Sequence, residues 1–204
     1  MPDSAGTPPG TNHRIRQSPI QADDMWHSTF GPSVEHFSFR ESTGDTANRL
    51  NGQLLRAIDR STVHIYYEIL ADSRWHTREA RISVNSLEAD ILLSGDGAGH
   101  WSMADVSMNA FGGFLDVDLR FTPSTNLLPI RRLNLAVGES AAVQSVWLRF
   151  PEFTLEPLYQ TYTRTHGNTY LYTSATGYEG KITVDEHGIP IQYGDVWERV
   201  GQSP

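Results

Sequence analysis

The stretch of residues 114–133, FLDVDLRFTPSTNLLPIRRL, decides the fold because it joins a strand pattern to a helix pattern. Its first residues alternate between apolar and polar side chains, which is the period of a half-buried β-strand. Asp116 and Asp118 therefore lie on one face of the predicted strand, with Cα atoms about 6.5 to 7 Å apart. The apolar residues that share the opposite face are Leu115, Val117, Leu119 and Phe121.

The second half of this stretch predicts a short helix over residues 125–133. Thr125 stands where an N-cap is expected, and Arg131 and Arg132 suit the C-terminal end, where the backbone carbonyls favour cations. Pro129 limits the length of the helix, because proline lacks the backbone N–H that a helix interior needs.

The rest of the chain repeats the strand pattern with a period of two. Turns rich in glycine, asparagine and aspartate separate the alternating runs, which is typical of a sandwich or a barrel. We therefore expect a mainly β fold in a single domain over residues 25–204. The predicted strands lie within residues 62–69, 79–84, 143–150, 159–164, 170–175 and 178–185.

Residues 1–24 are predicted to form a disordered N-terminal tail. They are rich in proline, glycine, serine and threonine and contain no aromatic residue, so they cannot bury enough surface to become ordered. The tail also has no apolar run of the kind found in a secretory leader. No apolar run in the chain approaches the roughly 20 residues of a transmembrane helix, so no transmembrane segment is expected.

Composition excludes several classes of function. The formal net charge of −8 argues against binding to nucleic acid, which requires basic residues to neutralise phosphates. The chain has no cysteine, which excludes thiolate catalysis and disulfides and fits a cytoplasmic location. Its histidines lack the spacing that lets two imidazoles share a metal, and no cofactor fingerprint or G-x-S-x-G motif occurs. We expect no metal, no cofactor and no catalytic residue.

Charges set deeply in apolar sequence need partners, so we expect Asp116 or Asp118 to pair with Arg131 or Arg132. Three interpretations of this group remain open: a structural ion-pair network, a polar ligand site, or a carboxylate pair for glycoside hydrolysis. Nearby arginines weigh against the last, because they would keep both acids ionised and leave no proton donor.

Tyrosines crowd the C-terminal third of the chain. Tyrosine combines an apolar ring with a polar tip, which suits a cavity for an amphiphile and equally suits ordinary strand packing. The tyrosines concerned are Tyr159, Tyr162, Tyr170, Tyr172, Tyr178 and Tyr193.

Several motifs resemble the bacterial putative glycolipid-binding family, a domain of unknown function. The central ones are Gly99-His100-Trp101, the strand over residues 114–119 and the TPSTNLLPIRRL run over residues 122–133. The likeness extends through Trp26, Glu35, Tyr66, Asp72, Trp75 and Arg78 upstream, and through Pro151, Gln160, Thr161, Tyr162, Val184, Asp185, Gly188, Tyr193 and Arg199 downstream. The resemblance implies a many-stranded antiparallel β-barrel or half-barrel around one short central helix at residues 127–133, likened to bacterial lipoprotein carriers, and a homodimer.

The residues and the resemblance together predict a non-enzymatic protein that binds a glycolipid or another fatty-acyl amphiphile. Two alternatives stay open: a hydrolase that acts on a sugar-containing substrate through Asp116 and Asp118, and a dimeric structural or interaction protein with no small ligand. The expected ligand-binding residues are Asp116, Asp118, Asn126, Arg131, Arg132 and Tyr162.

Overall fold

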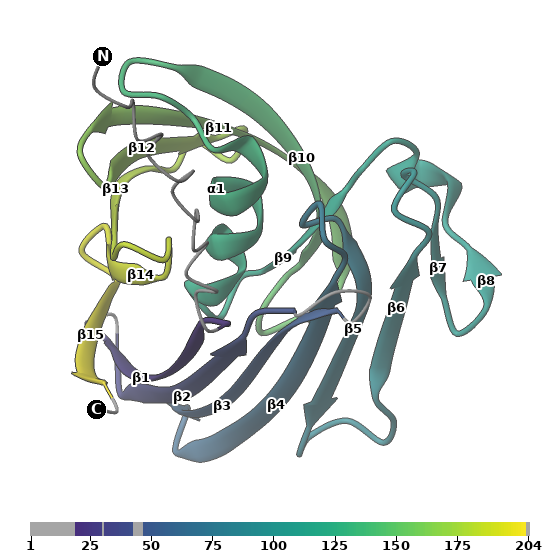
Figure 1. Ribbon diagram of the computed structural model, residues 1–204. Coiled ribbons are helices and arrows are strands. Elements are labelled where there is room, and N and C mark those ends of the chain that lie inside the picture. The colour runs from purple at the N-terminus through teal and green to yellow at the C-terminus, as the bar shows by residue number, and fades with distance from the viewer. Residues whose placement is uncertain (1–18, 30, 43–46, 203–204) are drawn as a thin grey trace, which may run out of the picture.

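The computed structural model describes residues 19–29, 31–42 and 47–202. All strands of this part belong to one fifteen-stranded sheet, which curves around a single short α-helix, α1 (Leu127–Leu133) (Figure 1). The mainly β fold predicted from the sequence is therefore confirmed. The strands are β1 (Gln21–Ser28), β2 (Ser33–Arg40), β3 (Asn48–Ile58), β4 (Ser61–Ala71), β5 (Thr77–Val84), β6 (Ile91–Gly95), β7 (Trp101–Met103), β8 (Val106–Ser107), β9 (Asp116–Leu119), β10 (Ser140–Leu148), β11 (Leu155–His166), β12 (Thr169–Ser174), β13 (Glu179–Val184), β14 (Pro190–Tyr193) and β15 (Trp197–Gln202).

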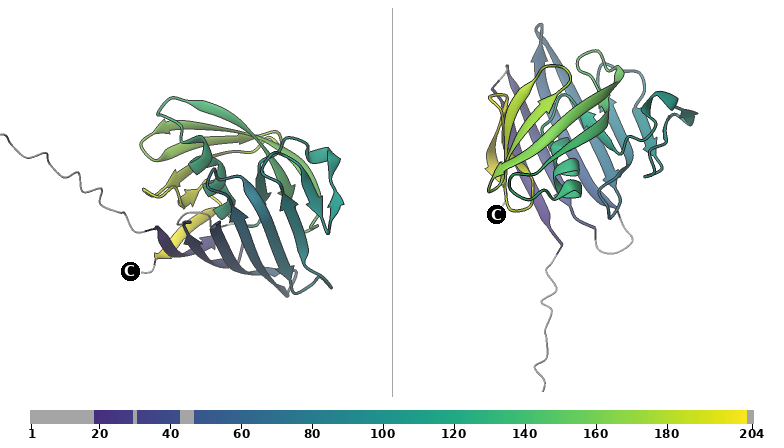
Figure 2. Two further views of the ribbon diagram at one scale, coloured as in Figure 1. Left: turned by 45° about the vertical axis from the view of Figure 1, so that its right-hand side comes forward. Right: turned by 90° about the horizontal axis from the view of Figure 1, so that it is seen from above.

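The sheet is a half-barrel rather than a closed barrel. Its strands run in the order β8 to β1, then β15 to β9, so two meanders join where β1 pairs with β15. Every pair is antiparallel except β9 with β10. The free edge of β9 approaches β5, where the Thr77 N–H donates to the Leu115 carbonyl at 2.9 Å and the Val117 N–H donates to Thr77 Oγ1 at 3.2 Å. Strands β6 to β8 project beyond this seam (Figure 2).

The first strand begins four residues before the predicted start of the fold. Residues 21–24, predicted to belong to the tail, pair with β2, and Asp24 is buried. Within this segment the Asp24 carboxylate pairs with Arg199 of β15 at 3.2 Å. The inward residues of this segment, Ala22 and Asp24, are therefore buried, and its composition does not reveal the ion pair with Arg199. The rest of the predicted tail, residues 1–18, lies outside the described residues.

The helix covers the residues that the motif implied, with Arg131 and Arg132 in its last turn. The predicted cap at Thr125 is wrong. Thr125 belongs to a 3₁₀ turn, η2 (Ser124–Asn126), which runs directly into α1, so no side chain caps the helix. The helix ends at Asn134, which adopts a left-handed backbone conformation with φ of 43°.

Strand β9 and helix α1 divide the interior into two parts. Val117 and Leu119 pack into the main core, together with the inward residues of β1 to β5. Asp116 and Asp118 lie on the other face of β9, toward strands β10 to β12. We call the region enclosed by β9, α1 and strands β10 to β14, which is packed with side chains, the C-terminal compartment. Its apolar wall includes Ile130 of α1 and Ile182 of β13.

Gly52 of β3 is required because the Tyr67 ring lies directly against it, where an added Cβ would overlap the ring. Tyr67 is fully buried, and its hydroxyl is tied to Glu35 and Ser124, so the ring cannot move aside. We expect Gly52→Ala to lower the free energy of unfolding by about 3 kcal/mol in urea denaturation.

Gly112→Ala is the matched control for this prediction. Its φ is −58°, and an added Cβ would meet its nearest atom at 3.6 Å, so its effect should stay within about 0.5 kcal/mol. Equal losses in the two variants would contradict the packing of Tyr67 on Gly52.

Candidate functional site

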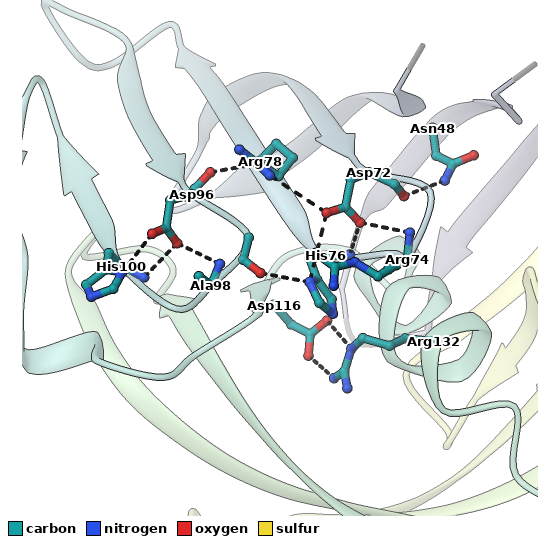
Figure 3. A network of polar contacts seen from close by, with 12 residues as sticks. Asn48, Asp72, Arg74, His76, Arg78, Asp96, Ala98, His100, Asp116 and Arg132 are labelled. Carbon is teal, nitrogen blue, oxygen red and sulfur yellow. Dashed lines mark hydrogen bonds and ion pairs between the residues drawn. The ribbon is translucent and has the colours of Figure 1, made fainter. Parts of the chain in front are cut away.

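Asp116 and Arg132 form a buried ion pair at the edge of the C-terminal compartment (Figure 3). The Asp116 side chain is 1% exposed, and both of its oxygens accept hydrogen bonds from the guanidinium of Arg132. Burial raises the pKa of Asp116, while the charge and hydrogen bonds of Arg132 oppose that rise. The pairing predicted from the sequence is therefore confirmed for these two residues.

Asp118 has a different environment, although it points to the same side of β9. Among the described residues its carboxylate has no cationic partner, and Oδ2 accepts one hydrogen bond, from Gln160 Nε2 at 2.8 Å. The same Nε2 donates to the Tyr172 hydroxyl at 3.0 Å, and Ser145 Oγ donates to Gln160 Oε1 at 3.1 Å. Burial raises the pKa of Asp118 to about 6, opposed by the Gln160 hydrogen bond and assisted by the nearby Asp116. Asp118 can therefore change protonation state near neutral pH.

Four tyrosines near Asp118 pack against one another through three edge-to-face contacts and one tilted contact, and we call them the tyrosine cluster. They are Tyr162, Tyr172, Tyr178 and Tyr193. Tyr172 lies at the centre, with ring centroids 5.2 Å from Tyr162 and 5.7 Å from Tyr193. Tyr178 lies over Gly180 and Gly194, where any Cβ would overlap its hydroxyl. Tyr178 and Tyr193 are half-buried, so they mark the side on which the compartment meets solvent.

The start of α1 is fixed to the same compartment. The Tyr162 hydroxyl donates to Asn126 Oδ1 at 2.8 Å, and Asn126 Nδ2 donates to the Pro123 carbonyl at 2.9 Å. Five of the six predicted site residues thus gather around this compartment: Asp116, Asp118, Asn126, Arg132 and Tyr162.

Arg131 is the predicted site residue that the structure places elsewhere. It pairs with Glu41, donates to the His187 carbonyl at 3.3 Å, and its guanidinium lies 4.7 Å from the centre of the Trp75 ring. These contacts attach the end of α1 to three separate turns and edges of the sheet. Within the described chain, Arg131 therefore acts as an anchor of the helix.

A second polar network lies beside the Asp116–Arg132 pair (Figure 3). It holds the turn between β4 and β5, where His76 Nδ1 hydrogen-bonds the Gly97 carbonyl at 2.9 Å and Asp72 lies 3.8 Å from Arg78. His76 also lies near Asp116 and, together with Arg132, opposes the rise that burial causes in the pKa of that carboxyl. In the part of the chain that the structure describes, no group of three histidine, aspartate or glutamate side chains is arranged to hold a metal.

A fully buried carboxyl group that was not predicted from the sequence lies in the main core. Glu35 of β2 accepts hydrogen bonds at Oε1 from the Tyr67 hydroxyl at 2.5 Å and from Thr122 Oγ1 at 2.8 Å. Burial raises the pKa of Glu35 to about 8, and these two bonds oppose the rise. Glu35 shares the inward face of β2 with Ser33 and Phe37, so the strand period could have predicted that its side chain is buried.

The family described as "Putative glycolipid-binding" matches residues 23–199. The chain belongs to this family. The motif over residues 114–133, which carries β9, η2 and α1, lies wholly within the family match.

A solved structure supports the same assignment. The chain is similar to the crystal structure of a DUF1089 family protein from Pseudomonas aeruginosa, with 29% sequence identity and a TM-score of 0.72. The similarity covers 97% of this chain and 100% of that chain. A search of curated proteins finds no significant match. Among the described residues, no helix has the length and apolar character needed to span a membrane.

Proposed function

We propose that the protein binds a glycolipid or another amphiphile without catalysing a reaction, and that the head group occupies the C-terminal compartment. The observation that carries this proposal is the position of Asp118. Its carboxylate faces the tyrosine cluster, is held by one amide, and has no cation beside it among the described residues. Head-group hydroxyls could donate to this carboxylate, while the apolar faces of a sugar ring pack against tyrosine rings.

The surrounding contacts support the same assignment. Asp116 is occupied by Arg132, and Asn126 is occupied by Tyr162, so these four residues shape the compartment and leave Asp118 as the principal acceptor. In the proposal, the acyl chain leaves along the half-buried rings of Tyr178 and Tyr193. Membership of the "Putative glycolipid-binding" family is consistent with such a ligand.

Isothermal titration with octyl glucoside below its micellar concentration tests the proposal. We expect saturable binding of one molecule per chain, and no comparable binding of octanol or glucose alone. Asp118→Asn should weaken the binding at least tenfold, because an amide accepts hydrogen bonds less strongly than a carboxylate. Asp90→Asn, on an exposed residue near Arg81, is the control and should bind like the wild type. Equal affinity in both variants would contradict the role of Asp118.

One observation favours a hydrolase as the second candidate. Asp116 pairs with Arg132, whereas Asp118 has no cation beside it among the described residues and burial raises its pKa to about 6, so the two acids have the unlike environments that acid and nucleophile roles require. Release of nitrophenol from aryl glycosides by the wild type, lost in Asp118→Asn, would assign this activity.

A homodimer and a cytoplasmic location complete the proposal, supported by the resemblance and the absence of cysteine. Sedimentation equilibrium measures the former.

A further inference from the structure

The outer face of β1 to β4, opposite to the interior, carries a polar hollow of about 380 Å³. Its shape follows from the register of the strands. Ser38 of β2 lies at the centre, between Asp23 of β1 and Asn51 of β3. Along β2 the outward neighbours of this short side chain are the longer His36 and Arg40. A short residue surrounded by long ones leaves a depression with Ser38 at its floor.

One end of this hollow carries an arginine pair. Arg40 and Arg49 lie directly opposite each other on β2 and β3, an arrangement that destabilises a sheet unless the charges are neutralised. Arg49 pairs with Glu68, whereas Arg40 is exposed and has no acidic partner among the described residues. A second hollow of about 290 Å³ shares both arginines, so the pair stands between two depressions. Arg40 is therefore the cation of this pair that is left to meet an anionic ligand.

The floor and the other walls offer groups for hydroxyls. Asn51 and Gln53 present amides, and the carboxylates of Asp23 and Glu68 can accept from hydroxyl donors. Asp23 lies 3.7 Å from His36 at the side away from the arginines. If the anionic group of a ligand is bound at Arg40, the rest of the molecule would thus lie across Ser38, over polar side chains.

We propose that this hollow binds a hydroxylated organic phosphate, with the phosphate between Arg40 and Arg49 and the hydroxylated body over Ser38 and Asn51. Arginine suits this role because its planar fork can bind two phosphate oxygens at once. The volume lies within the range of small-molecule sites. The ligand would be a free sugar phosphate or the head group of a phospholipid, which share this chemistry. The site is independent of the C-terminal compartment, because it lies on the opposite face of the sheet.

Titration calorimetry with glucose 6-phosphate, glucose and inorganic phosphate tests this site. We expect saturable binding of glucose 6-phosphate, at least tenfold tighter than inorganic phosphate, and no detectable binding of glucose. Arg40→Gln and Ser38→Phe should each weaken it at least tenfold, the first by removing the cation and the second by filling the floor. Arg81→Gln, on an exposed arginine of β5 that has its own acidic neighbour, should bind normally.

Sedimentation with phosphatidylglycerol vesicles separates the two sources of the phosphate. Binding to vesicles that Arg40→Gln abolishes, without binding of glucose 6-phosphate, would assign a lipid head group and support the site. Binding of inorganic phosphate as tight as glucose 6-phosphate would reveal an adventitious ion only and overturn the proposal. Binding of neither probe, or equal binding by Arg40→Gln, would also overturn it. Folding of each variant is checked by thermal unfolding, and both substituted side chains lie on the outer face.

Discussion

Replacing Glu35 with glutamine should abolish most of the loss of stability that the wild-type protein shows between pH 4.5 and about pH 8. In this window the native state keeps the buried Glu35 protonated, whereas the unfolded chain releases the proton. Stability therefore falls as pH rises, is fully present below the unfolded pKa of 4.5, and stops changing above about 8. The shift of the Glu35 pKa corresponds to about 5 kcal/mol across the window.

Urea denaturation at a series of pH values measures this slope. Glutamine has nearly the same shape as protonated glutamate and does not titrate, so Glu35→Gln should give a much flatter profile. Asp118→Asn is the matched control. The pKa of Asp118 is raised to about 6, so Asp118 also makes stability fall as the pH rises, but its contribution is complete at a lower pH than that of Glu35. A Glu35→Gln profile as steep as the wild type would show that Glu35 is not the buried carboxyl responsible.

Arg132→Met should lower the free energy of unfolding by about 3 to 5 kcal/mol, because it leaves the Asp116 carboxylate buried without a cation. Arg131→Met is the natural comparison, since the two arginines are neighbours in α1. Arg131 and its partner Glu41 are each about a quarter exposed, so we expect a smaller loss, about 1 to 2 kcal/mol, including the contact with Trp75.

The double variant Asp116→Asn/Arg132→Met separates a lost ion pair from lost packing. When neither residue carries a charge, the free-energy cost of burying an unpaired carboxylate disappears, and a large part of the stability should return. Equilibrium unfolding of the two single variants and the double variant completes the cycle. Equal losses in Arg131→Met and Arg132→Met, with no recovery in the double variant, would contradict the assigned roles of the two arginines.

The local parts of this fold could be predicted from the sequence because they depend on period and on local chemistry. Strands β4 and β5 follow from alternation over residues 62–69 and 79–84, and α1 follows from the motif at its own position. The Asp116–Arg132 pair followed from the rule that buried charges need partners. Such inferences need no knowledge of which distant strands become neighbours.

The remaining features depend on contacts between distant residues. The fold begins four residues earlier than predicted, and Asp24 in that first strand meets Arg199, which is 175 residues away. Glu35 meets Thr122 across 87 residues. Asp116 and Asp118 have different environments because Asp118 meets Gln160 of β11, 42 residues away, whereas Asp116 meets Arg132 of α1. Likewise, Arg131 and Arg132 diverge because consecutive helical residues point about 100° apart.

Native mass spectrometry of the purified full chain, before and after gentle organic extraction, tests most directly whether an amphiphile occupies the C-terminal compartment. We expect the wild type to carry one defined adduct of glycolipid or acyl-lipid mass, which extraction removes. Asp118→Asn, folded and purified in the same way, should carry much less of it. A clean mass of the bare chain in the wild type, or an equal adduct on Asp118→Asn, would contradict binding of an amphiphile at this site.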